Sequence, residues 1–392
     1  MKITDVRSTI IRVPFLEVVR DKWPEGYQTI IVEVETDEGV VGIGESGMWL
    51  EPEIQLQILD EAKRGVLGED PFDMERIRSK LWGPASVHRR YWPINRSLSG
   101  IETAIWDVMG KACGKPLCKL LGGMFRNKVP FMPCLYRYPE VETRVKEAED
   151  KVERGFKCFH IKVGEDGGTP EEDLAVVKAV REAVGSDVAL VIDANSGWST
   201  GTAIRMIRKM ERDDLLYVED PVSSLDEMAV IRKRVEVPIC AHVFAAGSEQ
   251  EALDVIKKEA ADVMVVAHRN VGICGVKKAA AVAEAASIPV VLHSGFELGP
   301  ALSVMVHLAA STPNCIYPNQ LQYDLISDDI IKGGRLEFVD GCLEVPEKPG
   351  IGVELDPEKM SRYAEDWREF RRRYPLSDDP HGPREVRWMP FW

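Results

Sequence analysis

The sequence lacks any long uninterrupted apolar segment. No stretch approaches the ~18 apolar residues that a membrane-spanning helix needs. The N-terminal residues MKITDVRSTIIRVPF alternate like a strand, whereas a signal peptide begins with a basic region followed by an unbroken apolar core. These features predict a cytoplasmic protein without a membrane partner.

Basic residues are too few and too scattered for a nucleic-acid partner. The chain has 50 Lys and Arg against 64 Asp and Glu, a formal net charge of −14. Binding a phosphate backbone requires clustered positive charge. The one basic run, Arg368–Arg373, is interrupted by Glu369 and Phe370, and this spacing is typical of a helix side that faces solvent or a second subunit.

Paired cysteines are also missing. None of the eight cysteines forms a CxxC pair, so we expect buried, reduced thiols and no disulfide framework. Cys240, two residues before His242, is expected to be a buried structural cysteine as well. With 392 residues and 45% hydrophobic content, the chain is long enough for a barrel and a second, smaller domain.

Residues 1–125 show strands first and helices afterwards, which indicates an α+β domain. The expected strands are 3–14, 29–36 and 40–45, and the expected helices are 53–65, 72–81 and 95–112.

Residues 126–355 alternate between strands and helices, which predicts a (β/α)₈ barrel. Strands are expected near 131, 160, 191, 217, 239, 265, 291 and 316. Helices are expected at 140–154, 171–184, 200–212, 224–234, 248–258, 273–287 and 298–310. Residues 356–392 should form a helix and an aromatic tail, RWMPFW, that packs on the first domain or on a neighbouring subunit.

Polar residues stand where the apolar strands of the barrel end. They recur at intervals of about 23 to 33 residues: His160, Asp193, Glu219, His242, His268 and His293. Since the carboxyl ends of barrel strands meet at one mouth, these side chains should converge there. A lone Asp would more often cap a helix, but two carboxylates brought together repel unless a cation lies between them. Asp193 and Glu219 are therefore candidate metal ligands.

Several longer motifs now carry a family resemblance. They are HIKVG (160–164), VIDANSGW (191–198), VEDPV (218–222), SGIETAIWDVMGKACGKPLCKLLGG (99–123) and EVPEKPGIGVELD (344–356). This set resembles the mandelate racemase/muconate lactonizing enzyme branch of the enolase superfamily, on the side of its glucarate dehydratases. The resemblance implies an α/β fold: a modified (β/α)₈ TIM-type barrel with an N-terminal α+β capping domain that the C-terminal segment completes. It also implies a divalent metal, usually Mg²⁺, that holds a substrate carboxylate while a base removes the α-proton to give an enediolate.

The resemblance assigns roles to particular residues. Lys162 and His293 would be the acid–base pair on opposite faces of the substrate, and Asn195 a substrate-binding companion of Asp193. His160 stands where the family often has the first Lys of a Lys-x-Lys motif, and it would stabilise the developing oxyanion.

Two further departures from the family pattern affect the site. Val243 aligns with the usual third ligand, so His242 is the expected replacement, which extends the candidate metals from Mg²⁺ to Mn²⁺, Fe²⁺ and Zn²⁺. Ala267 aligns with the Asp that normally orients the catalytic His. We therefore expect His293 to be the weaker base and Lys162 to abstract the proton, with His268 lining the substrate pocket.

These residues predict an acid-sugar dehydratase, although a racemase, epimerase or cycloisomerase would use the same set. A decayed barrel that binds a ligand without catalysis is the alternative outside enzymes. Family specificity resides on cap loops, here Phe15–Tyr27 and Glu45–Glu53, so the candidate pocket residues are Arg20, Trp23 and Trp49. The expected partner is a small carboxylate, and the expected assembly is a homo-oligomer, a dimer or an octamer.

Overall fold

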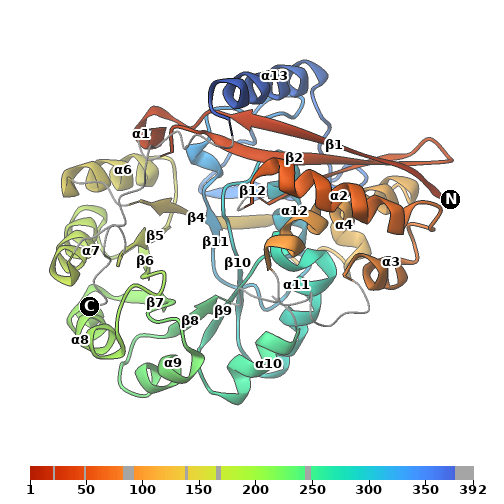
Figure 1. The fold of residues 1–392 in the computed structure, drawn as a ribbon. Coiled ribbons are helices and arrows are strands. Elements are labelled where there is room, and N and C mark those ends of the chain that lie inside the picture. Colours follow the sequence, from red (N-terminus) through yellow and green to blue (C-terminus); the bar gives the residue numbers. More distant parts are fainter. Residues whose placement is uncertain are drawn as a thin grey trace.

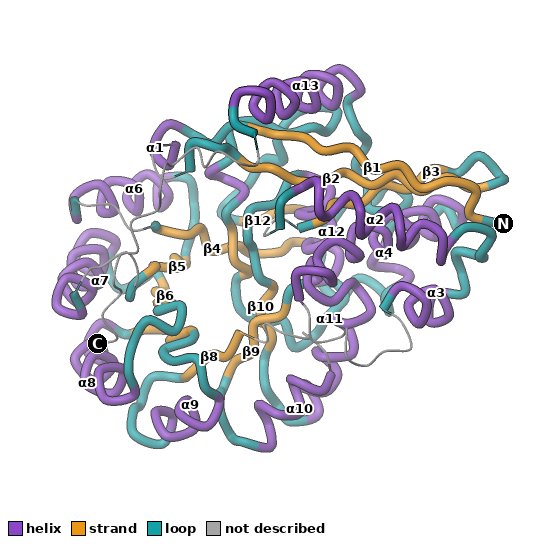
Figure 2. Tube along the Cα trace, in the orientation of Figure 1, coloured by secondary structure: helices purple, strands orange, loops and turns teal. Residues whose placement is uncertain are grey.

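The N-terminal part of the chain forms a three-stranded antiparallel sheet. The structure is a computed structural model that describes residues 1–20, 23–47, 50–82, 92–136, 140–164, 169–242 and 249–375. The strands are β1 (Ile3–Val13), β2 (Tyr27–Thr36) and β3 (Val41–Ser46), in the order β1-β2-β3 (Figures 1 and 2). The tight β2–β3 turn uses Gly39 at φ +76°, a left-handed conformation that glycine adopts without steric cost.

Helices α2 (Pro52–Val66), α3 (Met74–Leu81) and α4 (Trp92–Ala112) follow, and α4 lies directly on the sheet. Glycines in β3 make this close approach possible. A Cβ at Gly42 would lie 2.0 Å from the carbonyl oxygen of Ala104, and one at Gly44 would lie 2.1 Å from that of Gly100. Any larger residue at either position would push α4 off the sheet.

The second part of the chain forms a ring of eight parallel strands (Figures 1 and 2). The strands are β4 (Lys128–Leu135), β5 (Cys158–Lys162), β6 (Ala189–Asp193), β7 (Leu215–Glu219), β8 (Ile239–His242), β9 (Val263–Val266), β10 (Val290–Leu292) and β11 (Asn319–Leu321). They are hydrogen-bonded in sequence from β4 to β10, with β11 on the other edge of β4. The ring closes through side chains, because Asn319 Oδ1 accepts from Leu292 N at 2.9 Å and Gln320 Oε1 accepts from Ser294 N at 3.4 Å.

Helices surround this barrel, with one helix between most successive strands (Figure 2). They are α6 (Val141–Glu153), α7 (Pro170–Val184), α8 (Thr200–Met210), α9 (Leu225–Arg232), α10 (Glu249–Lys257), α11 (His268–Ala285) and α12 (Gly299–Ala310). Side-chain caps define two of the starts. Thr169 and Glu172 form a capping box at α7, and Ser199 accepts a hydrogen bond from Thr202 N at α8.

The C-terminal segment returns to the N-terminal sheet. Strand β12 (Cys342–Glu344) pairs antiparallel with β4, and helix α13 (Pro357–Arg373) then packs against β1 (Figure 1). Arg12 Nη1 on β1 pairs with Asp366 Oδ2 on α13 at 2.5 Å. The cap is thus completed by the C-terminal segment, as the sequence predicted. The predicted tail RWMPFW lies outside the described residues.

The remaining short elements are connectors. They are α1 (Glu17–Arg20), α5 (Leu117–Leu120), η2 (Glu211–Asp213) and η3 (Tyr323–Leu325). All eight cysteines are free. Five of them, including Cys240, are buried as expected, but Cys113 is exposed and Cys274 and Cys342 are half-buried. Among the residues that the structure describes, no helix combines the length and apolar character needed to cross a bilayer.

One predicted element was placed wrongly. The eighth strand was expected near residue 316, but Ile316 is exposed and the strand occupies Asn319–Leu321. The helix expected from residue 273 is the longer part of α11, and a short helical turn that starts at His268 precedes it across a kink at Gly272 (φ 71°). A Cβ at Gly272 would collide with the Glu102 carboxylate on α4, so the kink follows from this close approach.

Candidate active site

Strand register aligns three charged residues at the barrel mouth. Lys162, Asp193 and Glu219 are the last residues of β5, β6 and β7, and Lys162 is opposite Asp193, which is opposite Glu219. His160 precedes Lys162 by two residues. Because strand side chains alternate with a period of two, His160 points to the same side as Lys162, one layer deeper in the barrel.

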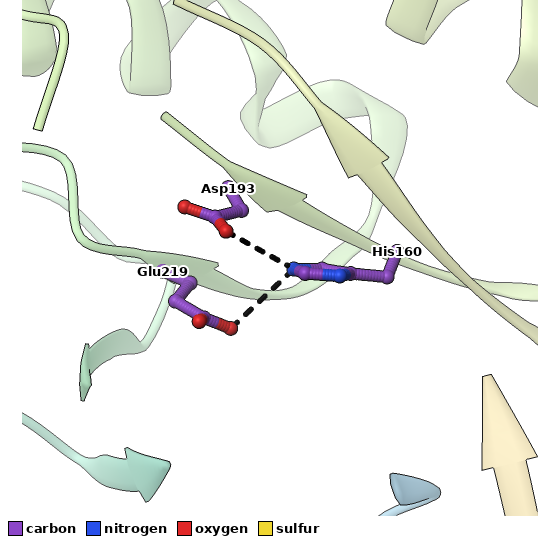
Figure 3. Close-up of side chains that lie close together, drawn as sticks. All are labelled: His160, Asp193 and Glu219. Carbon is purple, nitrogen blue, oxygen red and sulfur yellow. Dashed lines mark ion pairs between the residues drawn. The ribbon is translucent and has the colours of Figure 1, made fainter. Parts of the chain in front are cut away.

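These side chains form a compact buried cluster (Figure 3). His160 Nε2 lies 3.5 Å from Asp193 Oδ2 and 3.4 Å from Glu219 Oε2. Lys162 Nζ lies 2.5 Å from the same Asp193 oxygen. The three side chains that Figure 3 draws come from adjacent strands and point toward one another, and none is more than 1% exposed. Two carboxylates at this depth need positive charge beside them.

Close contacts within this cluster shift the pKa values of its members. Burial alone would raise the pKa of Asp193, but Lys162 and His160 outweigh burial and hold that pKa below its ordinary value. Burial and Lys162 act to lower the pKa of His160, but its closeness to Asp193, Cys134 and Glu219 raises it well above its ordinary value. His160 and Lys162 are therefore the basic groups placed to balance the two carboxylates.

A second group of histidines lies on the other side of the mouth. His242 ends β8, and His293 follows β10; their ring centroids are 4.3 Å apart with an interplanar angle of 41°. His242 Nδ1 is 3.8 Å from Glu219 Oε1, on the opposite carboxylate oxygen from the one nearest His160. Burial lowers the pKa of His242 to about 3, and burial, His242 and Arg96 lower the pKa of His293 well below its ordinary value.

His268 belongs to this second group. It is 2% exposed, and neither ring nitrogen has a hydrogen-bond partner among the described residues. Burial, Arg269 and Arg96 lower its pKa to about 3. A neutral, buried imidazole with both nitrogens unused can donate to or accept from a bound polar molecule.

Arg269 ties this half of the mouth to the cap. Its Nη1 donates to Tyr27 Oη at 3.0 Å and to the carbonyl oxygen of Phe296 at 2.5 Å, and its Nη2 lies 3.6 Å from Glu297. Tyr27 in turn donates to Glu45 Oε1 at 2.6 Å, and Glu45 accepts from Leu298 N at the start of α12. Cap strands β2 and β3 therefore hold the β10–α12 loop, which begins at His293.

The structure also identifies a site residue that the sequence did not indicate. Gln320 on β11 donates from Nε2 to Glu219 Oε2 at 2.7 Å, while its Oε1 accepts from Ser294 N. It thereby orients the carboxylate and joins β10 to β11. Its position would have been visible only if the eighth strand had been placed at Asn319–Leu321.

The predicted substrate-binding residues occupy different surroundings. Asn195 orients Asp193, donating from its backbone N to Oδ1 at 2.8 Å and from Nδ2 to Oδ2 at 3.1 Å. Trp23 lies in an aromatic cluster with Tyr136 and Phe296, at ring-centroid distances of 4.8 and 5.2 Å, close to the loop after β10. Arg20 ends α1 on the exposed surface. Trp49 and Val243 lie outside the described residues.

The donor set suits a divalent cation. One atom each from His160, Asp193 and Glu219 lies within 4.8 Å of the others, and all three residues are buried. Imidazole nitrogen and carboxylate oxygen are common ligands of divalent metals. The mouth therefore combines a group that could hold a metal with proton-transfer candidates on both sides of it.

Known families match both parts of the chain. Residues 23–122 match the mandelate racemase/muconate lactonizing enzyme N-terminal domain, and residues 143–359 match the enolase C-terminal domain-like family. A similar solved structure, an enolase from Pseudomonas fluorescens with bound magnesium, potassium and tartrate, has a TM-score of 0.81 and 27% identity. It covers 95% of this chain and 96% of its own.

Characterised relatives carry out different reactions. The chain is 30% identical to an arabinonate dehydratase of Saccharolobus solfataricus, over 84% of this chain and 88% of that protein. It is 29% identical to an N-succinyl-L-Arg/Lys racemase of Bacillus cereus, over 92% of this chain and 97% of that protein. On its two domain matches and these relatives, the chain belongs to the mandelate racemase/muconate lactonizing enzyme branch of the enolase superfamily.

Proposed function

We propose that the protein is a divalent-metal-dependent acid-sugar dehydratase. It would remove the proton α to a sugar carboxylate and eliminate the β-hydroxyl as water, leaving a 2-keto acid. The proposal is supported most by one arrangement: strands β6 and β7, with the buried pair Asp193 and Glu219, lie in the sheet between β5, which carries Lys162, and β10, which His293 follows.

Asp193, Glu219 and a histidine would hold the metal, with Mg²⁺, Mn²⁺, Fe²⁺ and Zn²⁺ as candidates. When bound, such a cation supplies fixed positive charge to the substrate carboxylate and so makes its α-proton more acidic. Asn195 and Gln320 keep the two ligand carboxylates oriented through their hydrogen bonds. The sequence expectation is that His242 is the third ligand.

Proton transfer would involve Lys162 and His293. Lys162 would take the α-proton, and His293 would donate a proton to the departing hydroxyl. Burial, His242 and neighbouring guanidinium groups lower the pKa of His293, and Ala267 offers it no carboxylate partner, so His293 would be the weaker base. We therefore assign proton abstraction to Lys162, and His293, once it has taken up a proton, would donate it to the departing hydroxyl.

The test is a library of mono- and diacid sugars incubated with the metal-loaded protein and assayed for 2-keto product. Formation of such a product from a defined subset of stereoisomers, abolished by a chelator, is the expected result. Metal-loaded protein that neither forms a 2-keto acid nor exchanges any α-proton with D₂O would contradict the proposal and favour a binding protein on this barrel.

A racemase or epimerase is the second candidate, favoured by the same positions of Lys162 and His293. Two acid–base groups on opposite sides of a substrate can exchange one α-proton for another without eliminating water. In D₂O, deuterium incorporation with inversion and no 2-keto product would identify this reaction. A cycloisomerase would instead give a ring-opened or ring-closed isomer.

A further inference from the structure

We propose that the metal ligands are His160, Asp193 and Glu219, and that this set selects a late first-row metal such as Co²⁺ or Zn²⁺ over Mg²⁺. This inference rests on the proposed metal dependence and names the ligands and the metal class. It differs from the sequence expectation, in which His242 completes the set and His160 is an oxyanion donor.

The distances between the donor atoms support this ligand set. A first-row ion bound at about 2.0–2.1 Å to each ligand places ligand atoms about 3.4 Å apart in a tetrahedral shell and about 2.9 Å apart in an octahedral one. His160 Nε2 lies 3.5 Å from the Asp193 oxygen and 3.4 Å from the Glu219 oxygen. A charge-assisted hydrogen bond would bring it to about 2.7–2.9 Å of one of them. The near-equal, longer spacing to both oxygens is that of co-ligands.

The position of His242 makes it a poorer third ligand than His160. His242 Nδ1 faces the other oxygen of Glu219, Oε1, at 3.8 Å. The oxygen nearest His160 is Oε2, to which Gln320 also donates. The buried group of mutually close donor atoms contains His160 and omits His242. His242 packs on His293, where it contributes to the neutral half of the mouth.

The chemical nature of the donor atoms determines which metal the set prefers. Replacing one carboxylate of an all-carboxylate set by imidazole lowers the negative charge of the set, which weakens its attraction for a hard ion such as Mg²⁺. A neutral nitrogen donor also favours ions later in the first row. The ligand set therefore points away from the metal bound in the Pseudomonas fluorescens relative.

Lys162 has a defined part in this site. Its Nζ contacts Asp193 Oδ2 at 2.5 Å, so it occupies a ligand oxygen that the ion requires. Metal binding must displace this ammonium group from Asp193. Lys162 is consequently an internal competitor of the metal, and its removal should tighten metal binding even though it abolishes catalysis.

The experiment titrates Co²⁺ and Mg²⁺ into the full-length metal-free chain, by calorimetry and by the visible absorption of bound Co²⁺. The variants are His160→Gln and its matched control His242→Gln, with circular dichroism to verify folding. We expect the wild type to bind Co²⁺ at least ~100-fold more tightly than Mg²⁺. His160→Gln should lower Co²⁺ affinity about 10- to 100-fold and reduce the Co²⁺/Mg²⁺ ratio, whereas His242→Gln should change either value by less than about 3-fold.

Lys162→Met provides a variant whose effect structural damage cannot imitate, since we expect it to raise Co²⁺ affinity. Loss of Co²⁺ binding in His242→Gln with little change in His160→Gln would overturn the inference, as would equal affinities of the wild type for the two metals. In either case the proposed function survives if acid-sugar exchange proceeds. Binding as predicted without exchange of any acid sugar would instead overturn the function and leave the metal site standing.

Discussion

Histidines on the two halves of the barrel mouth experience opposite environments. On the β5–β7 half, His160 faces Asp193 and Glu219, which raise its pKa well above the ordinary value against the effect of burial. On the β8–β10 half, His242 and His268 are equally buried, but their pKa values fall to about 3. The surroundings of histidine therefore favour its charged form on the first half and its neutral form on the second.

Neighbouring charge, and not burial, separates the two halves. All of these histidines are withdrawn from water, so burial disfavours the charged imidazole in each case. On the first half, Asp193 and Glu219 outweigh burial at His160. On the second half, Asp193 offsets burial only in part at His242, and the guanidinium groups of Arg269 and Arg96 add to the effect of burial at His268. We infer a division of labour in which the first half holds the metal and carries the base Lys162, and the second half meets the departing hydroxyl.

The largest effect should come from removing a carboxylate from the first half. Asp193→Asn or Glu219→Gln leaves too little negative charge to hold a divalent ion, so metal affinity should fall at least ~100-fold and product formation should cease. Calorimetric titration with Co²⁺ measures the loss. Asp262→Asn is the control, because Asp262 pairs with Arg232 away from the cluster. Equal metal content in wild type and both site variants would refute the assignment of this half.

Exchange of the substrate α-proton with D₂O separates the two proton-transfer groups. Lys162→Ala should stop exchange, because it removes the base. His293→Asn should slow product formation at least ~10-fold while leaving part of the exchange. Nuclear magnetic resonance of the recovered substrate follows both. If His293→Asn alone eliminates exchange, the two roles are reversed.

A substitution at residue 267, on the second half, should change the basicity of His293. Ala267, 2% exposed at the start of α11, is the residue that the family resemblance predicts to replace the orienting carboxylate. Ala267→Asp should make His293 more basic by stabilising its imidazolium, and it should raise exchange from the His293 side. Exchange measured in the Lys162→Ala background isolates this effect. No recovery in that double variant would show that residue 267 does not reach His293.

Gln320 should have an intermediate effect on metal affinity, because it orients Glu219 without binding the ion. Gln320→Leu removes the hydrogen bond to Glu219 Oε2, and loss of such a support typically costs about 10- to 100-fold in affinity. Gln320→Glu, which keeps the size but repels Glu219, should cost more. Titration with Co²⁺ compares them, and wild-type affinity in both variants would mean that Glu219 needs no support.

The last prediction concerns folding stability at the contact between the cap and the second half. Burial raises the pKa of Glu45 from 4.5 to about 7. Between these values the folded chain keeps a proton that the unfolded chain loses. The stability contributed by Glu45 is thus fully present below about pH 4.5 and is lost as the pH rises through about 7.

Glu45→Gln should flatten this dependence, by on the order of 3 kcal/mol of unfolding free energy across the interval. Denaturant unfolding between pH 5 and pH 8 measures it, with the exposed Glu61→Gln on α2 as the control. Parallel stability curves for Glu45→Gln and the wild type would show that Glu45 stays ionised throughout.

The sequence predicted the barrel well because its strands are apolar and its helices periodic, and those patterns follow from burial. It failed at β11, where Asn319 and Gln320 are polar because they close the ring and support Glu219. A strand selected for hydrogen bonding carries no apolar signature.

Prediction of the site residues succeeded where the signal is local and failed where it depends on distant segments. Strand ends identified His160, Asp193 and Glu219, since position along a strand is encoded locally, and the family resemblance added Lys162. The proximity of His160 to both carboxylates depends on the register of three strands. The contacts of Arg269 with Tyr27 and Glu297 join segments far apart in the chain. Such long-range relations have no local signal in one sequence.

The most direct test of the division between the halves is anomalous X-ray diffraction from crystals of the wild type soaked with Co²⁺. We expect one strong peak within about 2.3 Å of His160 Nε2, an Asp193 oxygen and a Glu219 oxygen, with Lys162 displaced from Asp193. A peak coordinated by His242 or His293, with His160 outside bonding distance, would contradict it.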